Sequence, residues 1–146
     1  PVSPTYSNGN GVYDNNGNLQ EAVTRDGVVK CYLYGYKSQY PVAEITGELY
    51  NNIKNYITQS ILDNPVSDTQ LRAHLNILRN SLPSAFVKTF TYEPLVGITS
   101  ETDANGRTQY YEYDSLNRLT IVRDSDNNII KRICYNYHGQ PENCGL

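Results

Sequence analysis

The stretch that decides the fold is YDNNGNL at residues 13–19, because it returns as YDSLNRL at residues 113–119. Each copy is a Tyr-Asp pair, two variable positions, a residue that tolerates positive φ, a polar residue and a leucine. Gly17 has no Cβ, and Asn117 is of a type that enters the left-handed region at low cost. The aspartate can bond the turn backbone, and the flanking Tyr and Leu favour strands. The phrase therefore predicts a recurring hairpin.

Similar turn phrases surround both copies. They are Asp26-Gly27, DANGR at residues 103–107 and DSDNN at residues 124–128. Asp-Gly between extended runs indicates a two-residue hairpin loop. We expect φ > 0 at Gly17, Gly27, Gly106 and Asn117. The residues assigned to the repeated turns are Tyr13, Asp14, Gly17, Gly27, Gly106, Tyr113, Asp114 and Asn117.

These phrases resemble the YD repeat of the Rhs/YD-repeat family, over residues 11–46 and 86–139. The family includes bacterial polymorphic toxins, insecticidal toxin subunits, wall-associated proteins and animal teneurins, and its repeats look like strands that spiral into a hollow shell. The departure is Asn117, where the family favours Gly. The resemblance implies a non-enzymatic structural or binding module of a secreted or surface-displayed bacterial protein. It also implies an extracellular or cell-surface location, with upstream repeats of the parent protein as partners.

Bulk composition narrows the function classes. The chain has 146 residues, a net charge of −3, fourteen Tyr and no Trp, with a mean hydropathy of −0.58. Scattered cations give no basic footprint for nucleic acid, and no run approaches the ~20 apolar residues of a membrane span. The chain begins at Pro1 and contains no Met, so we expect a C-terminal piece of a longer repeat protein.

A helical segment at residues 47–83 is predicted to interrupt the strands. Leu49, Ile53, Tyr56, Ile57 and Ile61 have helical spacing, which predicts one helix that ends near Asp63-Asn64, before Pro65. Ser67 and Gln70 form a capping box for a second helix, whose apolar stripe is Leu71, Leu75, Leu78 and Leu82. Pro83 ends it.

The expected fold is therefore α+β: one domain, residues 1–146, with an antiparallel β-sheet of YD-repeat hairpins and an inserted helical hairpin. Residues 1–10 are expected to be a loop. The β blocks at 11–46 and 86–138 should pair into one sheet, with the helices on one face, and residues 139–146 form a polar tail. The long apolar strand at 129–137 would leave an exposed edge, which favours a homodimer.

The cysteines leave two readings open. Cys31 and Cys134 lie in strand-like runs typical of buried apolar residues, whereas Cys144 lies in the tail and could pair with Cys134. Free thiols are the alternative. The spacing argues against zinc, and residues 124–128 begin a calcium-loop phrase that lacks its sixth-position Gly and twelfth-position Glu. We therefore expect an Asx-stabilised turn there, and no metal or cofactor.

No catalytic residues are predicted. His74 and His138 lack acidic, Cys or Ser partners in a recognised spacing. The strand at 28–36 should place Cys31, Leu33 and Gly35 on one face and its tyrosines on the other. A binding surface is expected at Tyr32, Tyr34, Tyr36, Tyr111 and Tyr113, joined by Tyr135 and Tyr137. Its roles are inter-strand packing or a platform for a glycan or a partner chain. Alternative functions are thus a glycan-binding module and the remnant of a polymorphic toxin or enzyme.

Overall fold

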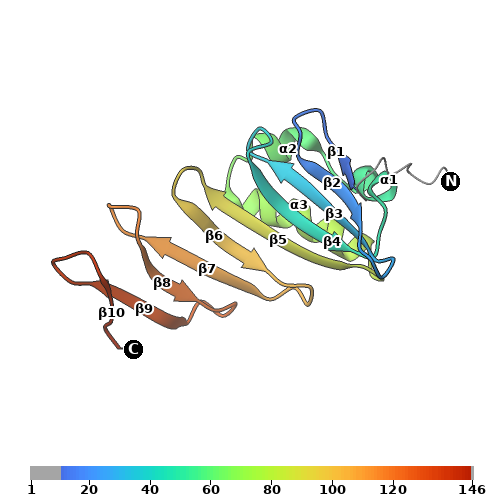
Figure 1. Cartoon of the computed structure of the whole chain (residues 1–146). Helices are drawn as coiled ribbons and strands as arrows, with labels where there is room; N and C mark the ends of the chain where they lie inside the picture. Colours follow the sequence, from blue (N-terminus) through green and yellow to red (C-terminus); the bar gives the residue numbers. More distant parts are fainter. Residues whose placement is uncertain (1–10, 146) are drawn as a thin grey trace. The chain divides into compact units, whose positions relative to one another are not determined.

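The computed structural model describes residues 11–145 (Figure 1), so the loop expected at residues 1–10 lies outside the described part. Ten strands form a mostly antiparallel sheet in which each strand pairs with the next along the chain. The strands are β1 Gly11–Tyr13, β2 Leu19–Val23, β3 Val29–Gly35, β4 Tyr40–Thr46, β5 Phe86–Glu93, β6 Gly97–Thr102, β7 Thr108–Tyr113, β8 Leu119–Arg123, β9 Ile129–Tyr135 and β10 Pro141–Asn143. The helices α1 Tyr50–Ile53, η1 Lys54–Tyr56, α2 Gln59–Asp63 and α3 Asp68–Ser81 stand between β4 and β5. Helices thus interrupt a mostly antiparallel sheet, consistent with the expected α+β class.

The chain divides into two compact units after Thr89, within β5. The first unit contains the helices, which lie against one face of its strands (Figure 1). Its core alternates along β3, where Cys31, Leu33 and Gly35 are buried and the intervening Tyr32 and Tyr34 are half-buried. The other core residues of this unit come from β4, the helices and β5: Val42, Ala43, Ile45, Ile53, Leu62, Leu71, Leu75, Leu78, Leu82 and Val87.

Helix α3 follows its sequence signals. The Ser67 Oγ accepts the N–H of Gln70 at 3.1 Å, and the Gln70 side chain accepts the N–H of Val66 at 2.7 Å. Leu71, Leu75 and Leu78 are fully buried. The N-cap at Ser67 and the leucine stripe are therefore confirmed, since both depend on spacing within one helix. The reciprocal bond of the capping box differs, because Gln70 accepts from Val66 and not from the N-cap residue.

The single helix expected up to Asp63-Asn64 is wrong. The chain forms α1, a 3₁₀ turn and α2, and it is extended at Ile57, where φ is −120° and ψ is 148°. Next to the break, the Thr58 N–H donates to Nε2 of His74 at 3.0 Å. A hydrogen bond to a residue distant in sequence replaces the intrahelical one, and Tyr56 is left 37% exposed.

The second unit is built differently, from strands alone. Among its described residues, Val122 is the one hydrophobic side chain that is buried. Its other buried side chains are the hydroxyls of Thr91, Ser100 and Thr102. The Thr91 Oγ1 lies 2.6 Å from Ser100 Oγ and 2.8 Å from Thr99 Oγ1. Polar pairing between neighbouring strands therefore takes the place of an apolar core.

The polar tail expected at residues 139–146 contains a further strand, β10, which pairs with Ile133–Tyr135 of β9. A disulfide joins Cys134 to Cys144. The pairing alternative is thus confirmed, and the burial expected of Cys134 is wrong because its side chain is exposed. Cys31 is a buried free thiol, as expected. The strand expected at 129–137 ends at Tyr135, and β10 covers part of its edge.

Within the described residues, no helix is both long and apolar enough to pass through a membrane.

Candidate functional site: repeated turns and a tyrosine-lined pocket

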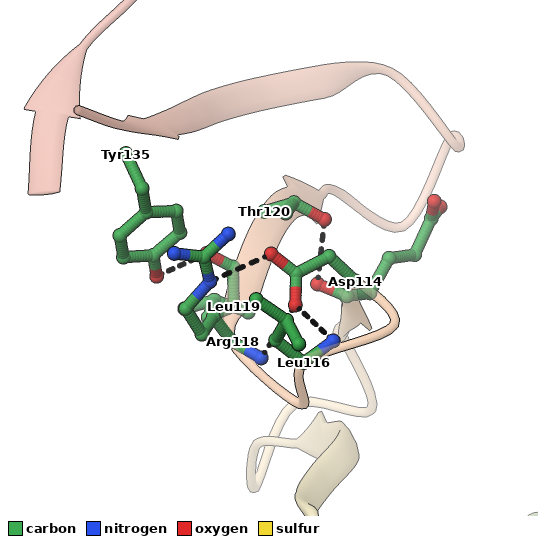
Figure 2. A network of polar contacts seen from close by, with 7 residues as sticks. Asp114, Leu116, Arg118, Leu119, Thr120 and Tyr135 are labelled. Atoms are coloured by element: carbon green, nitrogen blue, oxygen red, sulfur yellow. Dashed lines mark hydrogen bonds and ion pairs between the residues drawn. The ribbon is translucent and has the colours of Figure 1, made fainter. Parts of the chain in front are cut away.

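The turn between β7 and β8 defines a geometry that recurs along the chain (Figure 2). The Asp114 N–H donates to the Arg118 carbonyl, and the Asn117 N–H donates to the Asp114 carbonyl, both at 2.9 Å. Oδ1 of Asp114 accepts the N–H groups of Leu116 at 2.9 Å and of Arg118 at 3.0 Å. With φ of 61° at Asn117, this is a three-residue loop that ends in a left-handed bulge residue.

Five other turns repeat the two backbone hydrogen bonds of this loop, starting at Asp14, Thr24, Asp103, Asp124 and Asn136. The fourth residue of each has positive φ: 83° at Gly17, 84° at Gly27, 82° at Gly106, 67° at Asn127 and 77° at Gly139. The backbone conformations expected at Gly17, Gly27, Gly106 and Asn117 are therefore observed. The strand residues that flank the six loops also pair alike: Tyr13 with Leu19, Val23 with Val29, Thr102 with Thr108, Tyr113 with Leu119, Arg123 with Ile129 and Tyr135 with Pro141.

The loop expected at Asp26-Gly27 is one residue longer than the Asp-Gly signal indicates. It begins at Thr24, whose N–H donates to the Val28 carbonyl at 2.8 Å. The Thr24 Oγ1 accepts the Val28 N–H at 3.2 Å, in place of the Asp or Asn side-chain oxygen of the other loops. A search for a hydrogen-bonding side chain three positions before each turn Gly, and not one position before it, would have identified Thr24.

Arg118 ties its turn to a more distant strand. Its Nε donates to Oδ2 of Asp114 at 2.9 Å, and its guanidinium carbon lies 4.2 Å from the ring centroid of Tyr135. The Tyr135 hydroxyl in turn donates to the Leu119 carbonyl at 2.7 Å, and Figure 2 shows Arg118 between the carboxylate and the ring. A cation–π contact and an ion pair thus hold β9 against the β7–β8 turn.

Gly27→Val should lower the free energy of unfolding by at least about 1 kcal/mol, because a β-branched residue resists positive φ. An added Cβ at Gly27 meets nothing within 4 Å, so the cost is conformational and not steric. Chemical denaturation measures it. Val28→Thr, in the same turn at an exposed side chain, is the control. An unchanged unfolding midpoint for Gly27→Val would contradict the turn geometry.

Three turn carboxylates, Asp14, Asp114 and Asp124, have lowered pKa values. At Asp114 and Asp124 the main cause is the backbone N–H of Arg118 and of Asn128, respectively. At Asp14 desolvation is the largest single effect and acts upward, but the N–H groups of Asn18 and Asn16 together with the Asn18 side chain bring the pKa below 3.8. Hydrogen bonds to the charged form explain the direction in all three.

Acid should therefore destabilise the turns. A lowered pKa in the folded state means that the stabilisation is complete above the unfolded pKa of about 3.9 and disappears as the pH falls through the folded value. We expect the Tm to drop below about pH 4, measured by thermal melts across pH. Asp114→Asn with Asp124→Asn should flatten this dependence, because an amide oxygen accepts the same N–H groups, as Asn136 already does. An acid response as steep as that of the unmodified protein would contradict this assignment.

A pocket of about 310 Å³ lies in the first unit, beside the β1–β2 turn. It lies at the lower end of the range of small-molecule sites, about 300–1,000 Å³. Its walls come from that turn, from β2, β3 and the turn after it, and from α1 and α2. The lining residues are Asp14, Asn15, Asn16, Gln20, Tyr32, Leu33, Tyr34, Ser38, Tyr50, Gln59 and Asp63.

Strained backbone lies beside this pocket. Tyr36, Lys37 and Ser38 have φ of 52°, 60° and 65°, which is costly for residues with a Cβ, of order 1–3 kcal/mol each. The Asn16 Nδ2 donates to Ser38 Oγ at 3.0 Å, and the Asn18 Nδ2 donates to the Ser38 carbonyl at 3.1 Å. Side chains of the β1–β2 turn therefore hold Ser38 in place at the pocket wall.

The expected tyrosine surface is distributed over both units. Tyr32 and Tyr34 line the pocket together with Tyr50, which the helical pattern gave no reason to include. Tyr36 lies in the turn after β3, where its ring packs edge-on against Tyr40 at 5.8 Å. Tyr111 and Tyr113 belong to the second unit, and the Tyr113 hydroxyl donates to the Ile98 carbonyl at 2.7 Å. Tyr135 bonds Leu119 as described, and Tyr137 is 92% exposed.

Neither histidine lies in a catalytic arrangement among the described residues. His74 accepts the Thr58 N–H, and burial lowers its pKa. The His138 ring packs on Tyr137 with centroids 3.7 Å apart. Burial, and then the Glu21 carboxylate, raise the pKa of the Cys31 thiol to about 12, which makes it a poor nucleophile. No group of three or more metal-ligating side chains occurs between residues 11 and 145.

A known protein family matches part of the second unit, and solved structures are similar to most of the chain. Residues 96–129 match the RHS Repeat family. Among solved structures, the chain is similar to TcdB2-TccC3-Cdc42 (15% identity, 90% of this chain and 9% of that chain, TM-score 0.37) and to TcdB2-TccC3 (13% identity, 90% and 9%, TM-score 0.35). A structure of a mutant Photorhabdus luminescens Tc holotoxin pore is similar at 14% identity, over 90% and 8%, with a TM-score of 0.34. The chain therefore spans less than a tenth of the length of these chains. No curated protein matches it.

The matched segment contains the turns that start at Asp103, Asp114 and Asp124, together with β7 and β8. It thus includes the second Tyr-Asp phrase, at the position where the sequence resembles the YD repeat. Residues 96–129 are thus similar to the RHS Repeat family, which confirms the family resemblance that the sequence predicts for this segment.

Proposed function

We propose that the chain is a non-enzymatic structural module of a secreted or surface-displayed bacterial YD-repeat protein, with further repeats of a longer chain as its partners. The observation that carries this proposal is the second unit. From β6 to β10 its strands are joined by one repeated turn, and it has almost no apolar core among its described residues. A unit with so few buried apolar side chains would be stabilised by neighbouring strands in a longer sheet.

The six turns support the same hairpin repeat in both units. The RHS match covers residues 96–129, and the turns at Asp14 and Thr24 have the same backbone hydrogen bonds as the turns inside that match. We therefore assign the hairpins of the first unit to the YD repeat as well.

Hydrogen exchange tests the dependence of the second unit on neighbours. A small sheet with so few buried apolar side chains is marginal in water, so amides of β7 and β8 should exchange much faster than amides of α3 in the isolated chain. The same amides should gain protection in a longer protein that contains the chain. Equal protection of β7 and α3 in the isolated chain would contradict the proposal.

An enzymatic role is the rival class. Its test is an assay of the chain and of two histidine variants with ester, phosphoester, peptide and glycoside substrates. Turnover that disappears in His74→Ala or His138→Ala would overturn the structural assignment. Because His74 accepts the Thr58 N–H, the fold of that variant must be verified by circular dichroism. Activity that both variants retain would have to come from another site.

A homodimer through an edge strand is the remaining partner that we propose. Ile129–Arg132 of β9 lies beyond the residues that β10 pairs with, and unpaired strand groups attract another strand. Light scattering over a concentration series measures the association. A protein that is monomeric at every concentration would exclude it.

A further inference from the structure

We propose that the tyrosine-lined pocket of the first unit binds a small organic cation, an alkylammonium group. This assigns a ligand to a site outside the structural role proposed above. The first reason is charge. Two carboxylates, Asp14 and Asp63, line the pocket, and no lysine, arginine or histidine of residues 11–145 does.

The aromatic content of the pocket supports the same ligand. Tyr32, Tyr34 and Tyr50, three aromatic residues, line one small cavity. Tyrosine attracts cations through its ring, and sites for quaternary ammonium groups combine such rings with a carboxylate. An anionic ligand would meet two negative charges without a compensating cation.

Electrostatics in the pocket agree with this arrangement. Burial, followed by the charge of Asp14, raises the pKa of the Tyr34 hydroxyl. At Tyr50 burial is again the main cause of the raised pKa, and the charge of Asp14 adds to it. The charge of Asp14 thus acts on the hydroxyls of two of the three tyrosines that line the pocket.

The pocket is also held in place before a ligand arrives. Gln59 joins two of its walls, since its Nε2 donates to the Tyr34 carbonyl and to Oδ1 of Asp63, both at 3.0 Å. Asp14 is fixed by the N–H groups of Asn16 and Asn18, and the Asn16 side chain donates to Ser38 Oγ, in the turn after β3. A preformed site loses less entropy when it binds.

The test is titration of the whole chain, followed by NMR, with choline and tetramethylammonium as cationic probes. The uncharged isostere 3,3-dimethylbutan-1-ol is the matched control for choline, and N-acetylglucosamine represents a neutral sugar. We expect Kd values on the order of 1 mM or tighter for the cations, and affinity that falls with added salt. Binding by the isostere should be at least about tenfold weaker.

Matched variants separate the site from the fold. Asp14→Asn and Asp63→Asn should each weaken choline binding by about tenfold, because both keep a hydrogen-bond acceptor while removing a charge. Asp103→Asn is the control for Asp14→Asn, since Asp103 has the same turn position and accepts the same two backbone N–H bonds but does not line the pocket. Its choline affinity should be unchanged.

Four results would overturn the proposal. These are no binding of either cation in the millimolar range, equal binding of choline and its isostere, an equal loss in Asp103→Asn, and sugar binding that Asp14→Asn leaves intact. The last result would assign the pocket to a glycan. The hydrogen-exchange test of the second unit is independent of all four, so the two proposals fail separately.

Discussion

Leu75→Ala should lower the free energy of unfolding of the first unit by about 2–5 kcal/mol, the range for buried Leu→Ala changes. Leu75 is fully buried on α3, between Leu71 and Leu78, which are buried as well. The substitution removes apolar contacts and leaves a cavity that the surrounding helices and strands fill only in part. Denaturant unfolding, followed by the helical signal in circular dichroism, measures the loss.

Ile77→Ala is the control, because Ile77 lies on the same helix and is 60% exposed. Its effect should stay within about 0.5 kcal/mol. Equal losses for the two variants would mean that α3 does not bury its leucine stripe.

Gly35→Ala should cost about 1–3 kcal/mol or more, because β3 and α2 touch at this residue. A Cβ at Gly35 would lie 2.6 Å from the Leu62 carbonyl oxygen and 2.9 Å from Cγ1 of Val42. The first of these is backbone, which cannot rotate away. Relief would require α2 to move and would break the hydrogen bond from the Tyr36 N–H to the same oxygen, now 2.8 Å.

Gly11→Ala is the matched control in another strand of the same unit. Its Cβ would approach Cδ1 of Leu19 at 2.9 Å, but that atom ends a flexible side chain and can turn aside. The thermal shift of Gly11→Ala should therefore be small. If Gly35→Ala had the same Tm as Gly11→Ala, α2 would not be in close contact with β3 at this residue.

Local signals in the sequence predicted local features well. The positive φ of Gly17 and Asn117, and the cap of α3 at Ser67, each depend on a few adjacent residues, and the structure has them. The alternation of β3 was predicted up to Gly35, since period-2 burial is a property of one strand. Tyr36 does not continue this alternation, because the strand ends one residue before it.

Features that depend on distant residues were missed. The break before α2 is accompanied by the bond from Thr58 to His74, sixteen positions away. β10 has three residues and is recognisable through its pairing with β9. The pocket adds Tyr50, from a helix, to the tyrosines of β3. The spacing of residues along the chain does not predict contacts between distant segments. The disulfide between Cys134 and Cys144 was, however, among the alternatives that the sequence left open.

The common register of the six loops has a consequence for how such chains change over generations. Every loop returns the chain to the same pairing, so duplicating or deleting a stretch between equivalent loop positions leaves the remaining ladders in step. Because neighbouring strands run antiparallel, removing one strand would reverse the direction of all that follow, whereas removing two would not. The unit of gain and loss should therefore be a pair of strands with its two loops, and related chains should differ in length by whole pairs.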